Sequence, residues 1–252
     1  MSFPILEHDP TREALIEPSM INQPRDVPVH CIICFFNEVI EKITTEYHAK
    51  IIADSRWEDG AHHLYELTYK DQRIAFFHPG VGAPLAAGLF EDVIAYGCKK
   101  FIACGGCGVL EKGIHVGNLI VVSGAIRDEG VSYHYIAPDR EIAAQVSVVN
   151  TLSDSLSNRG ILHRVGKTWT TDAPFRETKN KISARKAEGC LTVEMEAAAL
   201  LAVSQFRQVK FGQILYGGDD LSGVEWDNRD WQSRTQIREE LFWLCADACL
   251  SL

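Results

Sequence analysis

The chain has 252 residues, 46% of them hydrophobic and 23% charged, a composition typical of a globular protein that buries its core within one α/β domain. Lys and Arg number 25 against 34 Asp and Glu, and the net charge of −9 argues against a nucleic-acid or anionic-membrane partner. No stretch approaches the roughly 20 consecutive apolar residues that are needed to span a bilayer. The first residues also lack the basic segment followed by an apolar segment that is typical of a signal peptide, so we expect a cytoplasmic protein.

The N-terminal segment is rich in proline, with Pro4, Pro10, Pro18 and Pro24 in its first 27 residues. Proline fixes its own backbone angle and has no N–H, so its repetition favours irregular structure. We expect residues 1–27 to form an arm laid over the body or over a neighbouring subunit. Residues 28–252 are then the folded domain.

Apolar runs and amphipathic stretches alternate along this domain. The predicted strands are residues 30–36, 63–69, 73–78, 101–104, 119–126, 161–171 and 211–217. A short helix is predicted from Asn37, and longer ones at residues 85–96, 140–159, 178–188, 193–206 and 229–250. The alternation predicts a single-domain, three-layer α/β/α fold with a mixed central sheet, in which ligands gather at the carboxyl ends of the strands.

Two pairs of the eight cysteines, Cys31/Cys34 and Cys104/Cys107, have the spacing of a zinc ribbon. The first pair lies within an apolar strand, where residues three apart point to opposite faces. We therefore expect no metal site. The cysteines are interpreted as small buried side chains that stay reduced.

Glycines follow two of the predicted strands. Gly80 and Gly82 stand between a strand and a helix, and Gly105 and Gly106 follow the strand at 101–104. Such turns can present backbone N–H groups to an anion or a hydroxyl. A tight turn without any ligand explains each of them equally well.

Carboxylates gather at two further places, at Glu194 and Glu196 on either side of Met195, and at Asp219 after another predicted strand. Acidic residues in a first helical turn are ordinarily explained by the helix dipole, and a glycine-rich acidic turn by solvation. Alternatively, one carboxylate accepts two hydrogen bonds from a vicinal diol and another holds or delivers a proton. Cleavage of a ribosyl bond requires both tasks.

In chain order, the stretches at residues 77–84, 105–108, 193–198 and 216–219 resemble signatures of the nucleoside phosphorylase superfamily, which contains uridine phosphorylase, hexameric purine nucleoside phosphorylase and methylthioadenosine nucleosidase. The resemblance covers the chain from about residue 30 to the C-terminus and is closest to the uridine phosphorylase branch. Val193-Glu194-Met195-Glu196 is its most specific part. The resemblance implies cleavage of the N-glycosidic bond of a nucleoside, without a cofactor.

The resemblance also implies roles for the acidic residues. Glu196 binds the 2′- and 3′-hydroxyls of the ribose, Met195 packs on the sugar, and Glu194 belongs to the same substrate-binding motif. Gly106 lies in the substrate-binding glycine loop. Asp219 matches the Asp that protonates or hydrogen-bonds the leaving base in purine-cleaving members.

The base-stacking loop of the family matches residues 171–175. Pro174 stands where the family usually has Phe, so Phe175 or Trp169 is expected to stack on the base instead. Thr178 and Asn180 fall where uridine phosphorylases carry the Gln and Arg that read uracil. The resemblance therefore leaves purine or pyrimidine specificity open.

His8, in the arm, resembles a family His that reaches across a dimer interface to the 5′-hydroxyl, although an ordinary surface His explains it as well. The resemblance implies a homo-oligomer, either a dimer or a hexamer built as a trimer of dimers.

The attacking nucleophile is water or phosphate. Phosphorylases of the family hold phosphate with Gly-Asp-Pro-x-Arg after the first strand and with an Arg before the second glycine loop, where this chain has residues 35–39 and Ala103. Glu38 instead falls where the nucleosidase branch has the Glu that activates water. We slightly favour hydrolysis. Phosphorolysis with phosphate as co-substrate, helped by Arg56 or another subunit's Arg, is the alternative, and a catalytically inactive nucleoside-binding protein is the third.

Overall fold

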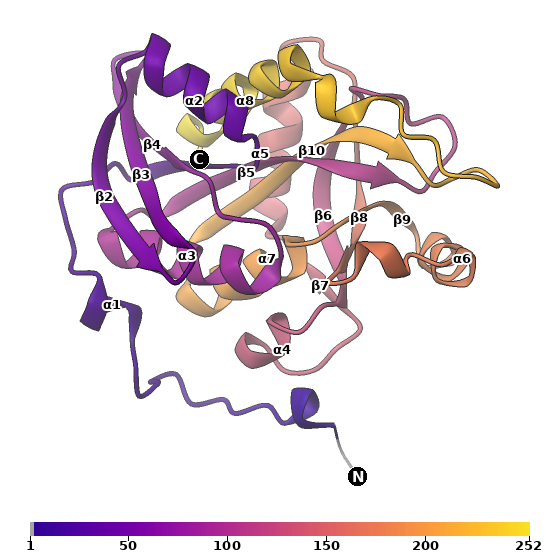
Figure 1. Ribbon diagram of the computed structural model, residues 1–252, viewed down its shortest axis with the longest axis horizontal. Coiled ribbons are helices and arrows are strands. Elements are labelled where there is room, and N and C mark those ends of the chain that lie inside the picture. The colour runs from indigo at the N-terminus through magenta and orange to yellow at the C-terminus, as the bar shows by residue number, and fades with distance from the viewer. Residues whose placement is uncertain (1–2) are drawn as a thin grey trace.

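The computed structural model describes residues 3–252 (Figure 1). Its strands are β1 (His30–Cys34), β2 (Lys50–Trp57), β3 (Gly60–Tyr69), β4 (Gln72–Phe77), β5 (Lys100–Val109), β6 (Leu119–Asp128), β7 (Glu141–Ala143), β8 (His163–Thr171), β9 (Cys190–Glu194) and β10 (Lys210–Asp220). Its α-helices are α1 (Pro18–Ile21), α2 (Asn37–Glu46), α3 (Ala83–Tyr96), α4 (Ser132–Tyr135), α5 (Val146–Ser157), α6 (Lys179–Ala187), α7 (Ala197–Arg207) and α8 (Thr235–Leu250), and the 3₁₀ turns are η1 (Pro4–Leu6), η2 (Pro174–Arg176) and η3 (Trp231–Ser233).

The strands form one mixed sheet, as predicted. Strands β4, β1, β5 and β10 run parallel to one another, while β2 and β3 extend the sheet as antiparallel neighbours. Beyond β5 the sheet closes on itself, because β10 pairs with β6, β6 with β8, β8 with β9 and β9 with the end of β5. The carboxyl ends of β1, β5 and β10 therefore meet at one edge.

Helices cover both faces of the sheet, which confirms the predicted three layers. Helices α2, α5 and α8 pack on one side, with α8 against β1 and β5, and α3, α4 and α7 pack together on the other (Figure 1). The apolar core between them is fully buried and includes Ile32, Phe90, Phe101, Leu200 and Phe242.

Three predicted helices start later in the structure, and one of them, predicted over 140–159, begins at Val146. The helix predicted over 193–206 begins at Ala197, because residues 190–194 pair with β8 and β5 as strand β9. The helix predicted over 229–250 begins at Thr235, since Arg229 and Asp230 adopt left-handed backbone angles (φ 53° and 48°) that interrupt a helix.

Three strands were not predicted: β9, which shifts the start of the helix predicted over 193–206, and two others. β2 is an edge strand whose side chains are mostly exposed, so its apolar alternation is weak. β7 occupies the start of the helix predicted over 140–159 and has three residues, too few for a periodic pattern.

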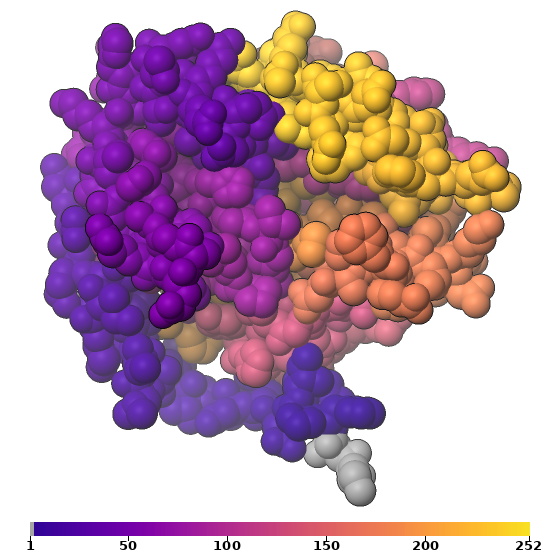
Figure 2. Space-filling model, in the orientation of Figure 1, coloured from indigo at the N-terminus to yellow at the C-terminus, as the bar shows by residue number. Residues whose placement is uncertain are grey.

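The arm is described from residue 3 onward, and its first two residues lie outside the described part. It contains only η1 and α1 as regular structure, and it runs along the outside of the body (Figure 2). Large apolar side chains on it face solvent, with Leu15 95% exposed and Ile21 72% exposed.

All eight cysteines are buried and free, which confirms their interpretation as small core side chains. Between residues 3 and 252 no helix combines the length and the apolar character that crossing a membrane requires.

Candidate active site

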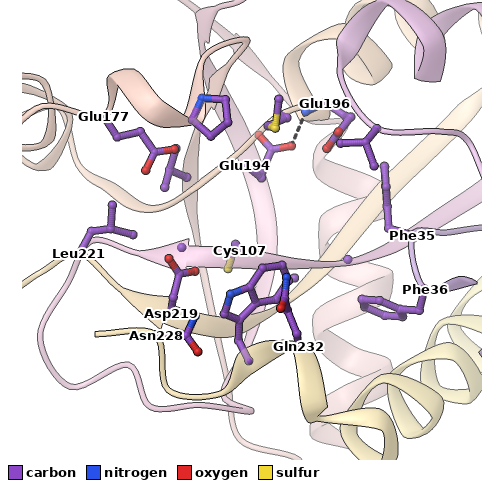
Figure 3. Close-up of a pocket in the computed structure, with 18 of the residues that line it drawn as sticks. Phe35, Phe36, Cys107, Glu177, Glu194, Glu196, Asp219, Leu221, Asn228 and Gln232 are labelled. Atoms are coloured by element: carbon purple, nitrogen blue, oxygen red, sulfur yellow. Dashed lines mark hydrogen bonds between the residues drawn. The ribbon is translucent and has the colours of Figure 1, made fainter. Parts of the chain in front are cut away.

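A cavity of about 1110 Å³ lies at the edge where β1, β5 and β10 end (Figure 3). Its walls come from distant parts of the sequence, because parallel strands bring their carboxyl ends together. The residues that line it are Phe35, Phe36, Val81, Gly105, Gly106, Cys107, Gly108, Pro174, Phe175, Glu177, Val193, Glu194, Met195, Glu196, Gln213, Asp219, Leu221, Trp226, Asn228, Trp231, Gln232 and Arg238.

Glu196 lines the cavity at the start of α7 and is 6% exposed. Its Oε1 accepts a hydrogen bond of 2.6 Å from the Gly82 N–H, at the start of α3. Gly82 has a φ of +91°, an angle that favours glycine, and this turn directs the N–H to the carboxylate. Burial, and then the neighbouring Glu194 charge, raise the pKa of Glu196.

Glu194 is bound by its own turn. Its carboxylate accepts hydrogen bonds from the backbone N–H groups of Glu196 (2.7 Å) and Ala197 (2.6 Å) and from Thr170 Oγ1 (2.6 Å). It therefore satisfies the first N–H groups of α7, as the helix-dipole interpretation predicted, and fixes the turn that presents Glu196. Half-buried Met195 lies between the two carboxylates in the cavity wall.

Asp219, at the end of β10, lines another part of the cavity (Figure 3). Its Oδ2 accepts a hydrogen bond of 2.7 Å from Trp226 Nε1, and burial raises its pKa. Glu177 also lines the cavity, and burial together with the Asp219 charge raises the pKa of Glu177 to about 7. Sequence reasoning missed Glu177 because it stands in a polar loop without a recognisable pattern.

The two residues proposed to stack on a base lie in different surroundings. Phe175 lines the cavity and is 98% exposed. Trp169 is fully buried and its Nε1 donates to Asp128 Oδ2 at 3.0 Å. Because β8 carries Trp169 into the core, the structure does not place it at the cavity, and Phe175 alone retains the proposed role. Thr178 and Asn180 do not line the cavity either.

Glu38 lies in the first turn of α2 and is not part of the cavity wall. Its Oε1 accepts a hydrogen bond of 2.6 Å from Nη1 of Arg238, on α8. Arg238 does line the cavity, is 8% exposed, and also donates to the Tyr216 hydroxyl at 3.0 Å and to the Trp231 carbonyl at 3.3 Å. Arg238 is therefore a cation of the site that sequence reasoning missed, whereas Arg56, the cation it suggested, does not line the cavity.

The glycines are explained in part by packing. A Cβ at Gly80 would lie 2.2 Å from Leu85 Cδ2, and one at Gly106 would lie 3.1 Å from Tyr216 Cε1. Gly105 faces Phe35 in the same way, at 3.3 Å. Gly105 and Gly106 lie within strand β5, which runs to Val109, and not in the turn predicted after residue 104. Both line the cavity and Gly80 does not, so close packing accounts for these positions whether or not a ligand binds.

His8 is half-buried in the arm, and its side chain does not line the cavity of its own chain. Its Nδ1 is buried and has no hydrogen-bond partner within residues 3–252. A role across a subunit interface stays a prediction.

Residues 29–251 match the family model described as the phosphorylase superfamily. The chain is 30% identical over 175 residues to a purine nucleoside phosphorylase, DeoD-type 1, of Shewanella oneidensis, an alignment that covers 64% of this chain and 72% of the relative. It is 26% identical over 159 residues to a uridine phosphorylase of Thermococcus kodakarensis, covering 58% of this chain and 57% of that protein.

Solved structures share the fold. A uridine phosphorylase from Vibrio fischeri superposes with a TM-score of 0.77 at 23% identity, covering 93% of this chain and 99% of that one. An AMP nucleosidase from Bacteroides thetaiotaomicron superposes with a TM-score of 0.70 at 20% identity, covering 88% and 87%.

Proposed function

The chain belongs to the phosphorylase superfamily, an enzyme family, and we propose that it cleaves the N-glycosidic bond of a nucleoside. The observation that carries this proposal is the presence of two carboxyl groups in one cavity, the buried Glu196 at the start of α7 and the half-buried Asp219 at the end of β10. Phosphorylases for purine nucleosides and for uridine among the relatives support the same reaction class.

The sugar is proposed to bind at Glu196. One carboxylate oxygen already accepts from the Gly82 N–H, which holds the group in place, and the other is left for the ribose hydroxyls. Met195 offers an apolar contact beside it. We call residues 194–196 the sugar end of the cavity.

The base is proposed to bind between Phe175, Glu177, Trp226 and Asp219, which we call the base end. As the C1′–N bond breaks, its electron pair moves to the base nitrogen, which receives the proton of Asp219. Burial raises the pKa of Asp219, so its carboxyl group stays protonated to a higher pH than that of an exposed Asp.

Water is our favoured nucleophile. Among the lining residues of the described chain, Arg238 is the only Lys or Arg, and its ion pair with Glu38 offsets its positive charge. Four acidic residues line the same cavity: Glu177, Glu194, Glu196 and Asp219. A doubly charged phosphate would meet this acidic wall. The water oxygen then adds to C1′ and its proton passes to Glu38, which stands outside the cavity wall and is connected to it through the hydrogen bond from Arg238.

Phosphorolysis is the second candidate, and Arg238 favours it. A guanidinium has five N–H donors, and Arg238 uses three of them on Glu38, Tyr216 and Trp231. The other two are left for an oxyanion.

A nucleoside panel assayed with and without phosphate tests the proposal, with chromatography of the base and sugar products. Hydrolysis releases base and free ribose in phosphate-free buffer. Ribose 1-phosphate as the main product would replace water by phosphate, and no base release from any nucleoside would leave a binding protein.

We further propose that the protein works as a homo-oligomer, a dimer or a hexamer. The support is the arm, whose exposed apolar side chains Leu15, Ile16 and Ile21 suit burial against another subunit. Light scattering that finds only a monomer of 28.1 kDa at micromolar concentration would reject this state and the role of His8.

A further inference from the structure

The loop between β10 and η3, residues 221–230, is closed at its base. The backbone N–H of Asp220 donates to the Asp227 carbonyl at 2.8 Å, and the N–H of Asp227 donates back to the Asp220 carbonyl at 3.0 Å. The guanidinium of Arg229 binds the Asp220 carboxylate and donates to the Ile114 carbonyl at 3.0 Å. These bonds hold the loop in a defined place beside the end of β10.

Trp226 folds from this loop back onto the cavity. Its indole lines the cavity and is 62% exposed, so burial of apolar surface is a small part of its contribution. Its Nε1 donates to Asp219 Oδ2 at 2.7 Å, a charge-assisted contact when Asp219 is ionised.

This bond divides the two oxygens of Asp219 between different tasks. Oδ2 is occupied by the indole. Oδ1 lies beside Gly108 in the cavity wall, where a Cβ would come within 3.6 Å of it. A Cβ at Gly108 would also lie 2.6 Å from Leu221 Cδ1 and 2.9 Å from Val193 Cγ1, so the glycine lets these side chains pack closely beside Oδ1.

We propose that Trp226 is a positioning residue that holds Asp219 through Oδ2, so that Oδ1 faces the leaving base. The inference rests on the proposed function, in which Asp219 acts on that base. Trp226 acts here through its N–H rather than through its aromatic face, which separates this role from stacking.

The charge of Asp219 is influenced by several further groups. Glu177 faces it across the cavity, Asp220 and Arg229 stand at the base of the loop, and the buried Cys107 thiol lies on β5. Burial raises the pKa of Asp219, and the Trp226 N–H lowers it. Removing that N–H therefore raises the pKa, so Asp219 stays protonated to higher pH.

The test is Trp226→Phe, which keeps an aromatic ring and removes the N–H. We expect kcat/KM to fall about 10-fold at the optimum, the scale of one lost bond to a charged group. We also expect the limb of the pH profile that belongs to Asp219 to move to higher pH. Circular dichroism and the melting temperature check that the fold is kept.

Trp57→Phe is the matched control. Trp57 Nε1 donates to Asp92 Oδ2 at 3.0 Å, so the variant loses the same kind of bond, and neither residue lines the cavity. It should leave kcat/KM and the pH profile unchanged. A second check is Asp219→Asn, in which Trp226→Phe should cause little further loss, because its partner is already altered.

Two results would overturn the inference while base release by the wild type stands. One is a Trp226→Phe enzyme with unchanged kcat/KM and an unmoved pH limb. The other is a loss in Trp226→Ala that Trp226→Phe does not share, which would assign Trp226 to stacking. Absence of base release by the wild type would instead overturn the proposed function, and this inference with it.

Discussion

The sugar end and the base end of the cavity are held in different ways. At the sugar end, Glu194 and Glu196 are 8% and 6% exposed, and their carboxylates are bound by backbone N–H groups of α7 and of the turn before α3. At the base end, Phe175 and Trp226 are 98% and 62% exposed, with Phe175 in the short turn η2 and Trp226 in the loop after β10. Figure 3 shows Glu194 and Glu196 together on one side and Asp219 and Glu177 on the other.

This difference indicates a division of labour. A carboxylate fixed by regular elements can bind one invariant group, such as a ribose diol, with little reorganisation. Exposed aromatic residues in loops can be substituted by other residues without disturbing the core. We therefore expect substitutions at the sugar end to reduce turnover of every nucleoside, and those at the base end to change which base is accepted.

The largest effect is expected at Glu196. Glu196→Gln keeps the shape of the side chain and one acceptor but loses the charge that, above the raised pKa of about 8, strengthens bonds to the ribose hydroxyls. We expect a loss of roughly 2 to 4 kcal/mol of transition-state stabilisation, measured as kcat/KM for several nucleosides. An equal loss for purine and pyrimidine substrates supports the comparison. A variant with unchanged kcat/KM, or one that no longer folds, would reduce Glu196 to a structural carboxylate.

The next effect concerns the nucleophile, which neither end supplies. If water attacks, Glu38→Gln should slow base release in phosphate-free buffer roughly 100-fold or more, because a positioned general base is removed. If phosphate attacks, the same variant frees Arg238 from its counter-charge, and the apparent affinity for phosphate should rise instead. Steady-state rates across a phosphate titration decide between these outcomes.

The same comparison explains what could be predicted from the sequence. The sugar end was found because Val193-Glu194-Met195-Glu196 is a local motif, and the mixed sheet followed from alternating strands and helices. Even there, the start of α7 was misplaced, because the pairing of β9 with β8 and β5 depends on distant segments.

At the base end, Glu177 and Trp226 are isolated residues in polar loops, and no spacing marks them. Arg238 was missed for a similar reason, since it meets Glu38 across 200 residues of sequence. Only the folded chain brings such residues to one cavity.

The smallest effect is expected at Glu177, and it depends on pH. Its pKa is raised from 4.5 to about 7, chiefly by burial and then by the Asp219 charge, so Glu177 is mostly protonated at pH 6 and mostly ionised at pH 8. Glu177→Gln resembles the protonated form. It should therefore change kcat/KM less than about threefold at pH 6 and more at pH 8, since charge repulsion with Asp219 is removed only where Glu177 is charged.

Stability gives an independent readout of the same group. The folded state holds the Glu177 proton more tightly than the unfolded chain does, so protonation of Glu177 adds to the free energy of unfolding. This contribution is fully present below about pH 4.5 and is lost as the pH rises through about 7. Glu177→Gln removes that dependence, so urea unfolding of the two proteins should diverge between pH 5 and about 8, with the variant the more stable at the upper end. A constant difference at every pH would show that Glu177 has no raised pKa, and that the base end is more open to water than the described cavity indicates.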